Sequence, residues 1–178
     1  MSRGPLGTSD VALTIDDGYC DECISAYVEF AEQSGIHLTF VPNGVYREKW
    51  DKYASRLRDL ARKGQVQVAN HTWSHRDVVK MPGISVRTEI QRNEDWIEES
   101  FGLTARPWFR PPFGSHNARS DAIAAGLGYT NILLWNGTFG DATVERPEEI
   151  LALASEHLQP GKIVLGHANH PQIIPHFG

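Results

Sequence analysis

The chain has 178 residues, of which 40% are hydrophobic and 10% aromatic, and it carries a net charge of -5 with a pI near 5.9. This length and composition suit one globular domain with a hydrophobic core. The acidic balance, without a basic block, argues against nucleic acid as a partner. No apolar stretch approaches the roughly 18 residues that cross a bilayer, so no transmembrane segment is expected.

We predict one domain, residues 11–178, which acts as a monomer. Residues 1–10 are expected to form a flexible N-terminal segment, and they lack the apolar region of a signal peptide.

Short apolar runs alternate with stretches of helical periodicity along the chain. Strands are predicted over residues 11–16, 37–41, 65–69, 108–110, 129–135 and 162–166. Helices are predicted over residues 23–34, 53–63, 84–101, 120–125 and 148–158. Glycines after the first three helices are typical C-terminal caps, and Pro147 favours the start of the last helix.

This alternation predicts an α/β fold with parallel strands joined by right-handed crossovers. Periodicity alone leaves open whether the strands form an open doubly wound sheet or a barrel. In both architectures functional residues gather at the carboxyl ends of the strands.

Polar side chains follow this rule in the sequence. The residues at or just beyond predicted strand ends are Asp16, Asp17, His71, His75, Arg110, Trp135, Asp141 and His167. Because the carboxyl ends of parallel strands meet at one edge, these side chains are predicted to converge.

His71 and His75 are spaced i, i+4, which places both imidazoles on one side of a single turn. Such a pair is often two surface or capping histidines, but here it directly follows an apolar strand. Two histidines and one aspartate form the ligand set of catalytic zinc, with one position open for water. The pattern therefore predicts a metal-dependent hydrolase.

A hydrolase also needs a base for the water and an acid for the leaving group. The aspartate of the pair that does not bind the metal supplies the base, and His167 the acid. Arg110 can hold the base carboxylate ionised and oriented, and backbone N–H groups near Phe113 and Gly114 can stabilise an oxyanion. Taken singly, Arg110 also fits a surface ion pair and His167 a core histidine.

Five motifs now carry a family resemblance. T-I-D-D-G, H-T-W-S-H, R-P-P-F-G, W-x5-D and L-G-H follow one another between residues 14 and 167. In this order they resemble the motifs of the polysaccharide deacetylase family, also called the NodB homology domain or carbohydrate esterase family 4. The resemblance implies a distorted (β/α)7 barrel that removes N-acetyl, or sometimes O-acetyl, groups from glycans such as peptidoglycan or chitin oligomers.

Residue by residue, the resemblance implies Asp16 as general base, Arg110 as its partner and His167 as general acid. It implies Asp17, His71 and His75 as ligands of a divalent metal, with Zn²⁺ expected and Co²⁺ or Ni²⁺ as alternatives. Leu165 belongs to the implied acetate pocket. Further residues expected at the substrate or oxyanion are Phe113, Trp135, Asp141 and Trp73.

The chain departs from the family pattern at three positions. Tyr19 stands where most members have proline, Thr138 replaces an aspartate, and Ala142 replaces a tryptophan. We expect these changes to make the cleft shallower or wider and to weaken the support of His167. The sequence ends 11 residues after His167, where the family usually has one more helix and strand, so the barrel is expected to be shortened or to close differently.

Two other functions remain open: hydrolysis of a cyclic amide or imide, and glycan binding with weak or no catalysis. Glycan substrates suggest an exported or cell-surface protein, with the cytoplasm as the alternative. Cys20 and Cys23 form a C-x-x-C pair, half of a structural zinc set. We expect structural thiols, with a disulfide or a redox pair as alternatives.

Overall fold

The computed structural model describes residues 1–5, 7–143 and 146–177. Its strands are β1 (Ala12–Asp17), β2 (Leu38–Pro42), β3 (Val66–Val68), β4 (Trp108–Phe109), β5 (Asn131–Ile132), β6 (Gly137–Thr138) and β7 (Ile163–His167). Its α-helices are α1 (Asp21–Ser34), α2 (Arg47–Trp50), α3 (Ala54–Arg62), α4 (Gly83–Phe101), α5 (Ala118–Ala125) and α6 (Pro147–His157). Short 3-10 turns are η1 (Gly44–Tyr46), η2 (Asp51–Tyr53), η3 (Pro112–Gly114) and η4 (Pro171–His176).

The strands pair in parallel throughout. Five of them form one sheet in the order β3-β2-β1-β7-β6, and β4 pairs with β5. Asn70 joins the two sheets, because its N–H donates to Trp108 O at 3.0 Å and its carbonyl accepts from Arg110 N at 2.9 Å. The predicted α/β fold of parallel strands is confirmed.

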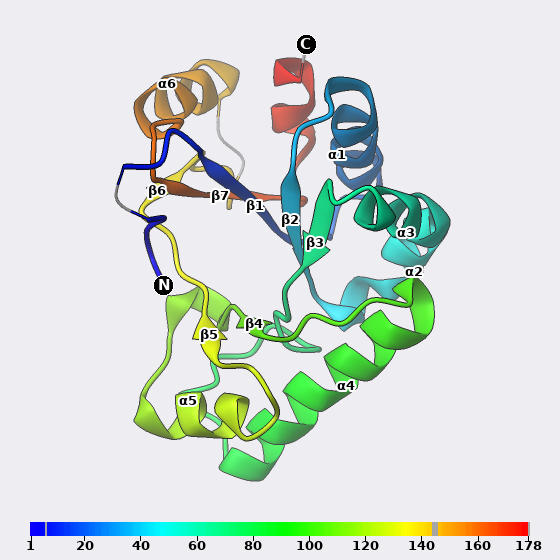
Figure 1. Ribbon diagram of the computed structural model, residues 1–178, viewed down its shortest axis with the longest axis vertical. Helices are drawn as coiled ribbons and strands as arrows, with labels where there is room; N and C mark the ends of the chain where they lie inside the picture. The colour runs from blue at the N-terminus through cyan, green and yellow to red at the C-terminus, as the bar shows by residue number, and fades with distance from the viewer. Residues whose placement is uncertain (6, 144–145, 178) are drawn as a thin grey trace.

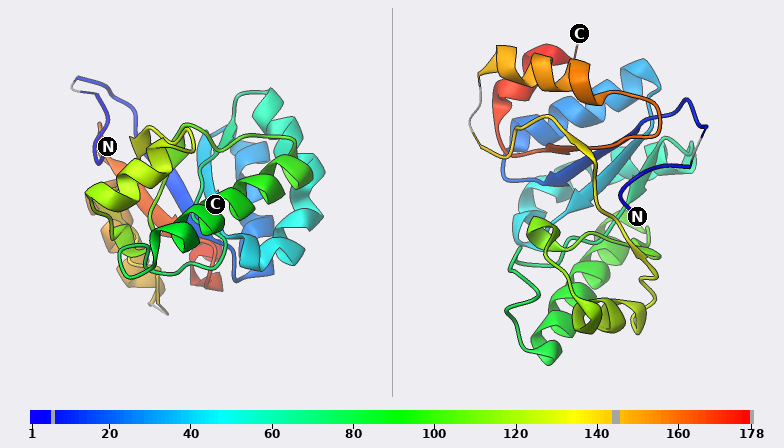
Figure 2. Two further views of the ribbon diagram at one scale, coloured as in Figure 1. Left: turned by 90° about the horizontal axis from the view of Figure 1, so that it is seen from below. Right: turned by 90° about the vertical axis from the view of Figure 1, so that its left-hand side faces the viewer.

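The helices lie outside the strands on two sides. In Figure 1, α1, α6 and η4 lie above the five-stranded sheet, whereas β4, β5, α4 and α5 form the lower half. The right-hand view of Figure 2 shows the same two halves from the side. Within the described residues, no helix is both long and apolar enough to cross a membrane.

The N-terminal residues contact the chain near β5 and just before β7. The Met1 ammonium donates to Ile132 O, and Met1 O accepts from Leu134 N at 2.7 Å. Arg3 forms an antiparallel bridge with Lys162. The flexibility predicted for residues 1–10 stays a prediction.

Strand β1 lies at the centre of the larger sheet, and its position explains how the site is assembled. Ile15 is fully buried in the core, so the neighbouring Asp16 points to the opposite face. Asp16 lies in register with Val41 of β2 and with His167 of β7. The pairing of three buried strands thus brings an aspartate and a histidine that are far apart in the sequence to one edge.

Three elements differ from the sequence-based prediction. The apolar run 129–135 predicts one strand, but only β5 forms there and the chain adds the unpredicted strand β6 beside β7. Helix α1 begins two residues early because Cys20 Sγ accepts from Cys23 N at 3.2 Å. No element was predicted over residues 44–52, but η1, α2 and the first two residues of η2 form there, and Trp50 is fully buried.

Cys20 and Cys23 form a disulfide bond, so the expectation of structural thiols is wrong and one of the alternatives holds. The bond joins the loop after β1 to the first turn of α1. Since helical geometry brings residues three apart onto one face, the two sulfurs meet there.

Gly18 provides a test of how tightly the end of β1 is packed. Its φ is +123°, and a Cβ there would lie 2.0 Å from Trp50 Nε1. We expect Gly18→Ala to lower the free energy of unfolding by about 2–5 kcal/mol, because backbone strain and overpacking add.

Gly35→Ala is the matched control, because Gly35 has φ +72° but no atom within 4 Å of the added Cβ. Its expected cost is about 1–2 kcal/mol from the left-handed backbone alone. Urea unfolding of both variants measures the difference. Equal costs would show that the contact with Trp50 does not constrain this turn.

Candidate active site

A cavity of about 500 Å³ lies at the carboxyl ends of the strands. Eight of the predicted site residues line it: Asp16, Asp17, His71, His75, Phe113, Trp135, Leu165 and His167. The convergence predicted from strand ends is therefore present in the structure.

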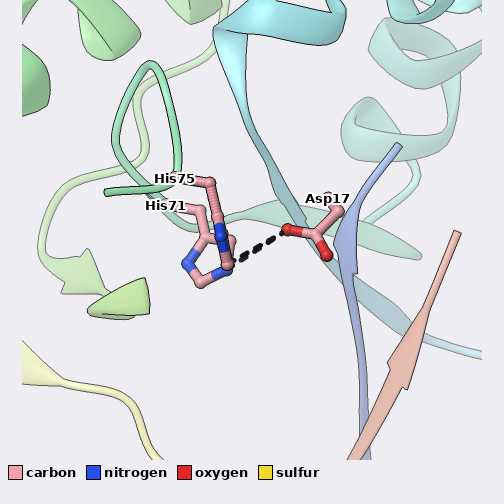
Figure 3. A group of neighbouring side chains, drawn as sticks. All are labelled: Asp17, His71 and His75. Atoms are coloured by element: carbon pink, nitrogen blue, oxygen red, sulfur yellow. Dashed lines mark ion pairs between the residues drawn. The ribbon is translucent and has the colours of Figure 1, made fainter. Parts of the chain in front are cut away.

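Asp17, His71 and His75 form one cluster (Figure 3). Asp17 Oδ1 lies 3.5 Å from Nε2 of each histidine, and the three donor atoms all lie within 4.8 Å of one another. Among the described residues, the buried Asp17 Oδ1 has no hydrogen-bond donor. A buried carboxylate oxygen without a donor, facing two imidazoles, fits a divalent cation.

The backbone around this cluster adopts uncommon conformations. The φ angles of Asp17, Thr72 and His75 are +72°, +67° and +54°. Left-handed backbone costs about 1–2 kcal/mol in a residue other than glycine, so the surrounding contacts must hold it. Strained backbone of this kind is concentrated at functional sites.

His71 is prepared to act as a neutral ligand. Its Nδ1 donates to Arg110 O at 2.7 Å, which leaves the lone pair of Nε2 toward Asp17. Burial lowers the pKa of His71 to about 3, because the charged imidazolium would lose its hydration. The ring is thus uncharged at neutral pH, as metal coordination requires.

Asn169 fixes the carboxylate of Asp17. Its Nδ2 donates to Asp17 Oδ2 at 2.7 Å, while Trp50 Nε1 donates to Asp17 O at 2.8 Å. Asn169 also lines the cavity. The sequence-based prediction missed Asn169, and the only signal was its place two residues beyond the end of β7.

Arg110 and Asp16 form a buried ion pair. Arg110 Nη1 lies 2.6 Å from Asp16 Oδ1 and donates to Thr14 Oγ1 at 2.8 Å, and the arginine is fully buried. Asp16 Oδ2 lies 3.4 Å from His71 Nε2, beside the metal-ligand cluster. Arg110 therefore orients the carboxylate, and the interpretation as a surface ion pair is wrong.

His167 is held by Asp141 through two hydrogen bonds. Its backbone N–H donates to Asp141 Oδ2 at 2.8 Å, and its Nδ1 donates to Oδ1 at 2.9 Å. Burial by itself lowers the pKa of His167, but the hydrogen bond and charge of Asp141, with the charges of Asp16 and Asp17, raise it above 6.5 overall. The support of His167 is therefore retained despite the altered fourth motif.

Of the remaining predicted residues, three line the cavity, and Trp73 lies elsewhere. Phe113, Trp135 and Leu165 line the cavity, as do the substituted positions Thr138 and Ala142. The Gly114 N–H, which was predicted to stabilise an oxyanion, donates to Pro111 O at 3.0 Å instead.

Trp73 lies elsewhere, and the prediction that it lines the cleft is corrected. It is absent from the lining of the cavity in the described part of the chain. Its ring packs at Gly44, with Arg92 Cζ 3.8 Å from the ring centroid and Trp96 in an edge contact. The physical reason is tertiary packing, because the Trp73 N–H donates to Glu89 O of α4 at 3.1 Å and holds the residue against that helix.

Comparison with known proteins agrees with this geometry. A model of the polysaccharide deacetylase family matches residues 3–132. The chain is 26% identical over 190 residues to a chitin deacetylase of Pestalotiopsis sp, which covers 98% of this chain and 61% of that protein. The chain spans about three fifths of the length of the first curated relatives that it matches.

Two solved structures show the same fold. A family 4 carbohydrate esterase from Streptomyces lividans, in complex with acetate, has a TM-score of 0.79 at 25% identity and covers 95% of this chain and 84% of its own. A CE4 family pseudoenzyme from Bacillus anthracis has a TM-score of 0.86 at 23% identity, with 98% and 60% covered. The similarity to the pseudoenzyme is a similarity of fold alone.

Asn169 gives a test of the ligand cluster. We expect Asn169→Ala to weaken binding of Zn²⁺ by about 10–100-fold, because the hydrogen bond that orients Asp17 is lost. Calorimetric titration of the metal-free protein measures the affinity. His170→Ala, next along the chain, is the control and should bind as the wild type does; equal affinity of the two variants would refute an orienting role.

Asp141 gives a pH-dependent test. Asp141→Asn removes the charge that raises the pKa of His167, so protonated His167 is lost at a lower pH. The fall of kcat/KM on the alkaline side should therefore begin at lower pH, and kcat/KM at alkaline pH should drop by about tenfold or more. The control is Asp121→Asn, whose Oδ2 lies 3.0 Å from Nδ1 of the part-exposed His116. An unchanged profile in Asp141→Asn would exclude this role.

Proposed function

This chain belongs to the polysaccharide deacetylase family, and from this premise we propose that it is a metal-dependent hydrolase that removes N-acetyl groups from a glycan. One observation carries the proposal. An ion-paired aspartate, an Asp-His-His cluster and an aspartate-bound histidine all face one cavity. These are the base, the metal site and the acid that hydrolysis of an amide needs.

Asp17, His71 and His75 would hold the metal. Two imidazoles and one carboxylate suit Zn²⁺, with Co²⁺ or Ni²⁺ as alternatives, since the set leaves a position open for water. When bound, such an ion polarises a carbonyl and lowers the pKa of water. Asp17 Oδ1 is buried and accepts no hydrogen bond from the described residues, which supports this assignment.

Asp16 acts as the base that takes the proton of the attacking water. Its Oδ1 is occupied by Arg110, so the second oxygen, beside His71 Nε2, is the one that can accept a proton. The guanidinium of Arg110 is a rigid donor group that matches the geometry of a carboxylate, and it therefore holds the carboxylate in one orientation. Such orientation brings the base close to the reacting atoms without further loss of entropy.

His167 acts as the acid that protonates the departing amine. Asp141 accepts from Nδ1, so Nε2 carries the proton that can be donated into the cavity. The pKa of His167 is raised above its ordinary value by the hydrogen bond and charge of Asp141, which favours the protonated ring that a general acid needs. The apolar side chains of Leu165 and Trp135 line the same cavity and suit the methyl of an acetyl group.

We propose an acetylated glycan such as chitin oligomers or peptidoglycan as the substrate, with O-acetyl groups as a secondary target. Action on such a polymer fits an exported or cell-surface protein. The disulfide between Cys20 and Cys23 supports that location, because disulfides persist in oxidising compartments.

The deciding experiment measures acetate release from N-acetylglucosamine oligomers before and after chelation. We expect release to stop with chelator and to return with Zn²⁺ or Co²⁺. No release from a protein shown to hold metal would refute the proposed reaction.

Asp16→Asn separates catalysis from binding. We expect it to retain metal and to lose acetate release by about 10²–10⁴-fold, the usual contribution of a general base. Asp59→Asn, which removes an exposed carboxylate paired with Arg62, is the control and should remain active. An active Asp16→Asn would show that another group acts as the base.

A further inference from the structure

We propose that Tyr19 and Tyr46 form an aromatic subsite at the rim of the cavity, which binds a sugar ring next to the one that is deacetylated. This inference rests on the proposed function. It adds a structural reason why the same site would prefer longer glycans. It concerns Tyr19 above all, one of the positions where the chain departs from the family pattern.

The first observation is where the rings of Tyr19 and Tyr46 lie relative to the cavity. Tyr46 lines the cavity, and its ring meets the ring of Tyr19 edge to face, with centroids 5.8 Å apart. Tyr19 itself does not belong to the cavity lining among the described residues, so it extends the aromatic surface outward from Tyr46. A ligand that reaches Tyr19 must therefore project beyond the cavity.

The exposure of Tyr19 is the second step. Its relative exposure is 59%, although it follows the buried residues of β1 by only two positions. Lys49 Nζ lies 4.3 Å from the centroid of the Tyr19 ring. The ring is thus supported by a cation–π contact and an aromatic neighbour, and it still exposes more than half of its surface.

The third step is that the backbone of Tyr19 is held in place. Its N–H donates to Asn169 Oδ1 at 3.2 Å, and its carbonyl accepts from Lys49 Nζ. The next residue, Cys20, donates to Ala168 O at 2.9 Å and is bonded to Cys23. An exposed aromatic ring on a fixed backbone loses little entropy when a ligand packs on it.

Sugar rings are suited to such a surface. One face of a pyranose presents C–H groups, which pack on an aromatic ring, while its hydroxyls stay hydrated. A tyrosine provides a rigid apolar face with a polar tip. The acetylated residue would occupy the cavity over Asp16 and Asp17, and the neighbouring residue would lie on Tyr19.

The test compares N-acetylglucosamine itself with its pentamer. We expect Tyr19→Ala to raise KM for the pentamer by about tenfold, with kcat unchanged, because uniform binding is lost. KM for the monosaccharide, which has no neighbouring ring to place on Tyr19, should change much less. Tyr19→Phe should behave as the wild type, because the ring is kept.

Ile84→Ala is the matched control, since Ile84 is 73% exposed on α4 and does not line the cavity. It should leave both substrates unaffected. Equal effects of Tyr19→Ala on the monosaccharide and the pentamer, or no effect on either, would overturn the subsite.

A second measurement separates this proposal from the proposed reaction. Pentamer binding is measured by calorimetry on Asp16→Asn and on Asp16→Asn with Tyr19→Ala, where no turnover is needed. A loss of about tenfold in affinity supports the subsite even if the wild type releases no acetate. Equal affinity, or no binding to either protein, overturns it.

Discussion

The site depends on one buried arginine. Arg110 is fully buried, and its side chain donates to Thr14 and Asp16 of β1 and to Leu133 O beyond β5. Its carbonyl accepts from His71 Nδ1, and its N–H donates to Asn70 O after β3. One residue therefore binds the proposed base, orients a proposed metal ligand and joins the two sheets. Breaking a buried ion pair costs about 3–5 kcal/mol, so the contact that orients Asp16 also stabilises the fold.

The two aspartates after Ile15 show how adjacent identical residues acquire different roles. The extended backbone turns Asp16 toward Arg110, whereas Asp17, with φ +72°, directs its carboxylate to His71 and His75. Asn169 and Trp50 then fix Asp17 from the side chain and from the backbone. The oxygen of Asp16 nearest the cluster lies 3.4 Å from His71 Nε2. A base and a ligand thus lie side by side without sharing a function, because each has its own hydrogen-bond partner.

Most of this arrangement follows from the sequence, since parallel strands force their carboxyl ends together. Asp16, Asp17, His71, His75, Arg110 and His167 were predicted on that ground. The structure brings all of them except Arg110 to one cavity, and Arg110 is buried beside Asp16. Asn169 and Tyr46 were missed because no spacing rule connects them to the site; only tertiary packing does. Trp73 was misplaced because proximity to the metal motif was used without the direction of its side chain. The state of Cys20 and Cys23 depends on contact between sulfurs, which a C-x-x-C pattern does not decide.

The fold alone does not establish activity in this family, as the likeness to a CE4 pseudoenzyme shows. The discriminating observation is that every proposed catalytic group has the partner that its role requires. Asp16 has Arg110, His167 has Asp141, and His71 has a carbonyl that fixes its tautomer. A protein that only binds a glycan gains nothing from a buried Asp–Arg pair or from a histidine whose pKa an aspartate raises, since each costs desolvation. The structure has both of these buried charged groups beside the same cavity, and the proposed catalysis explains them together.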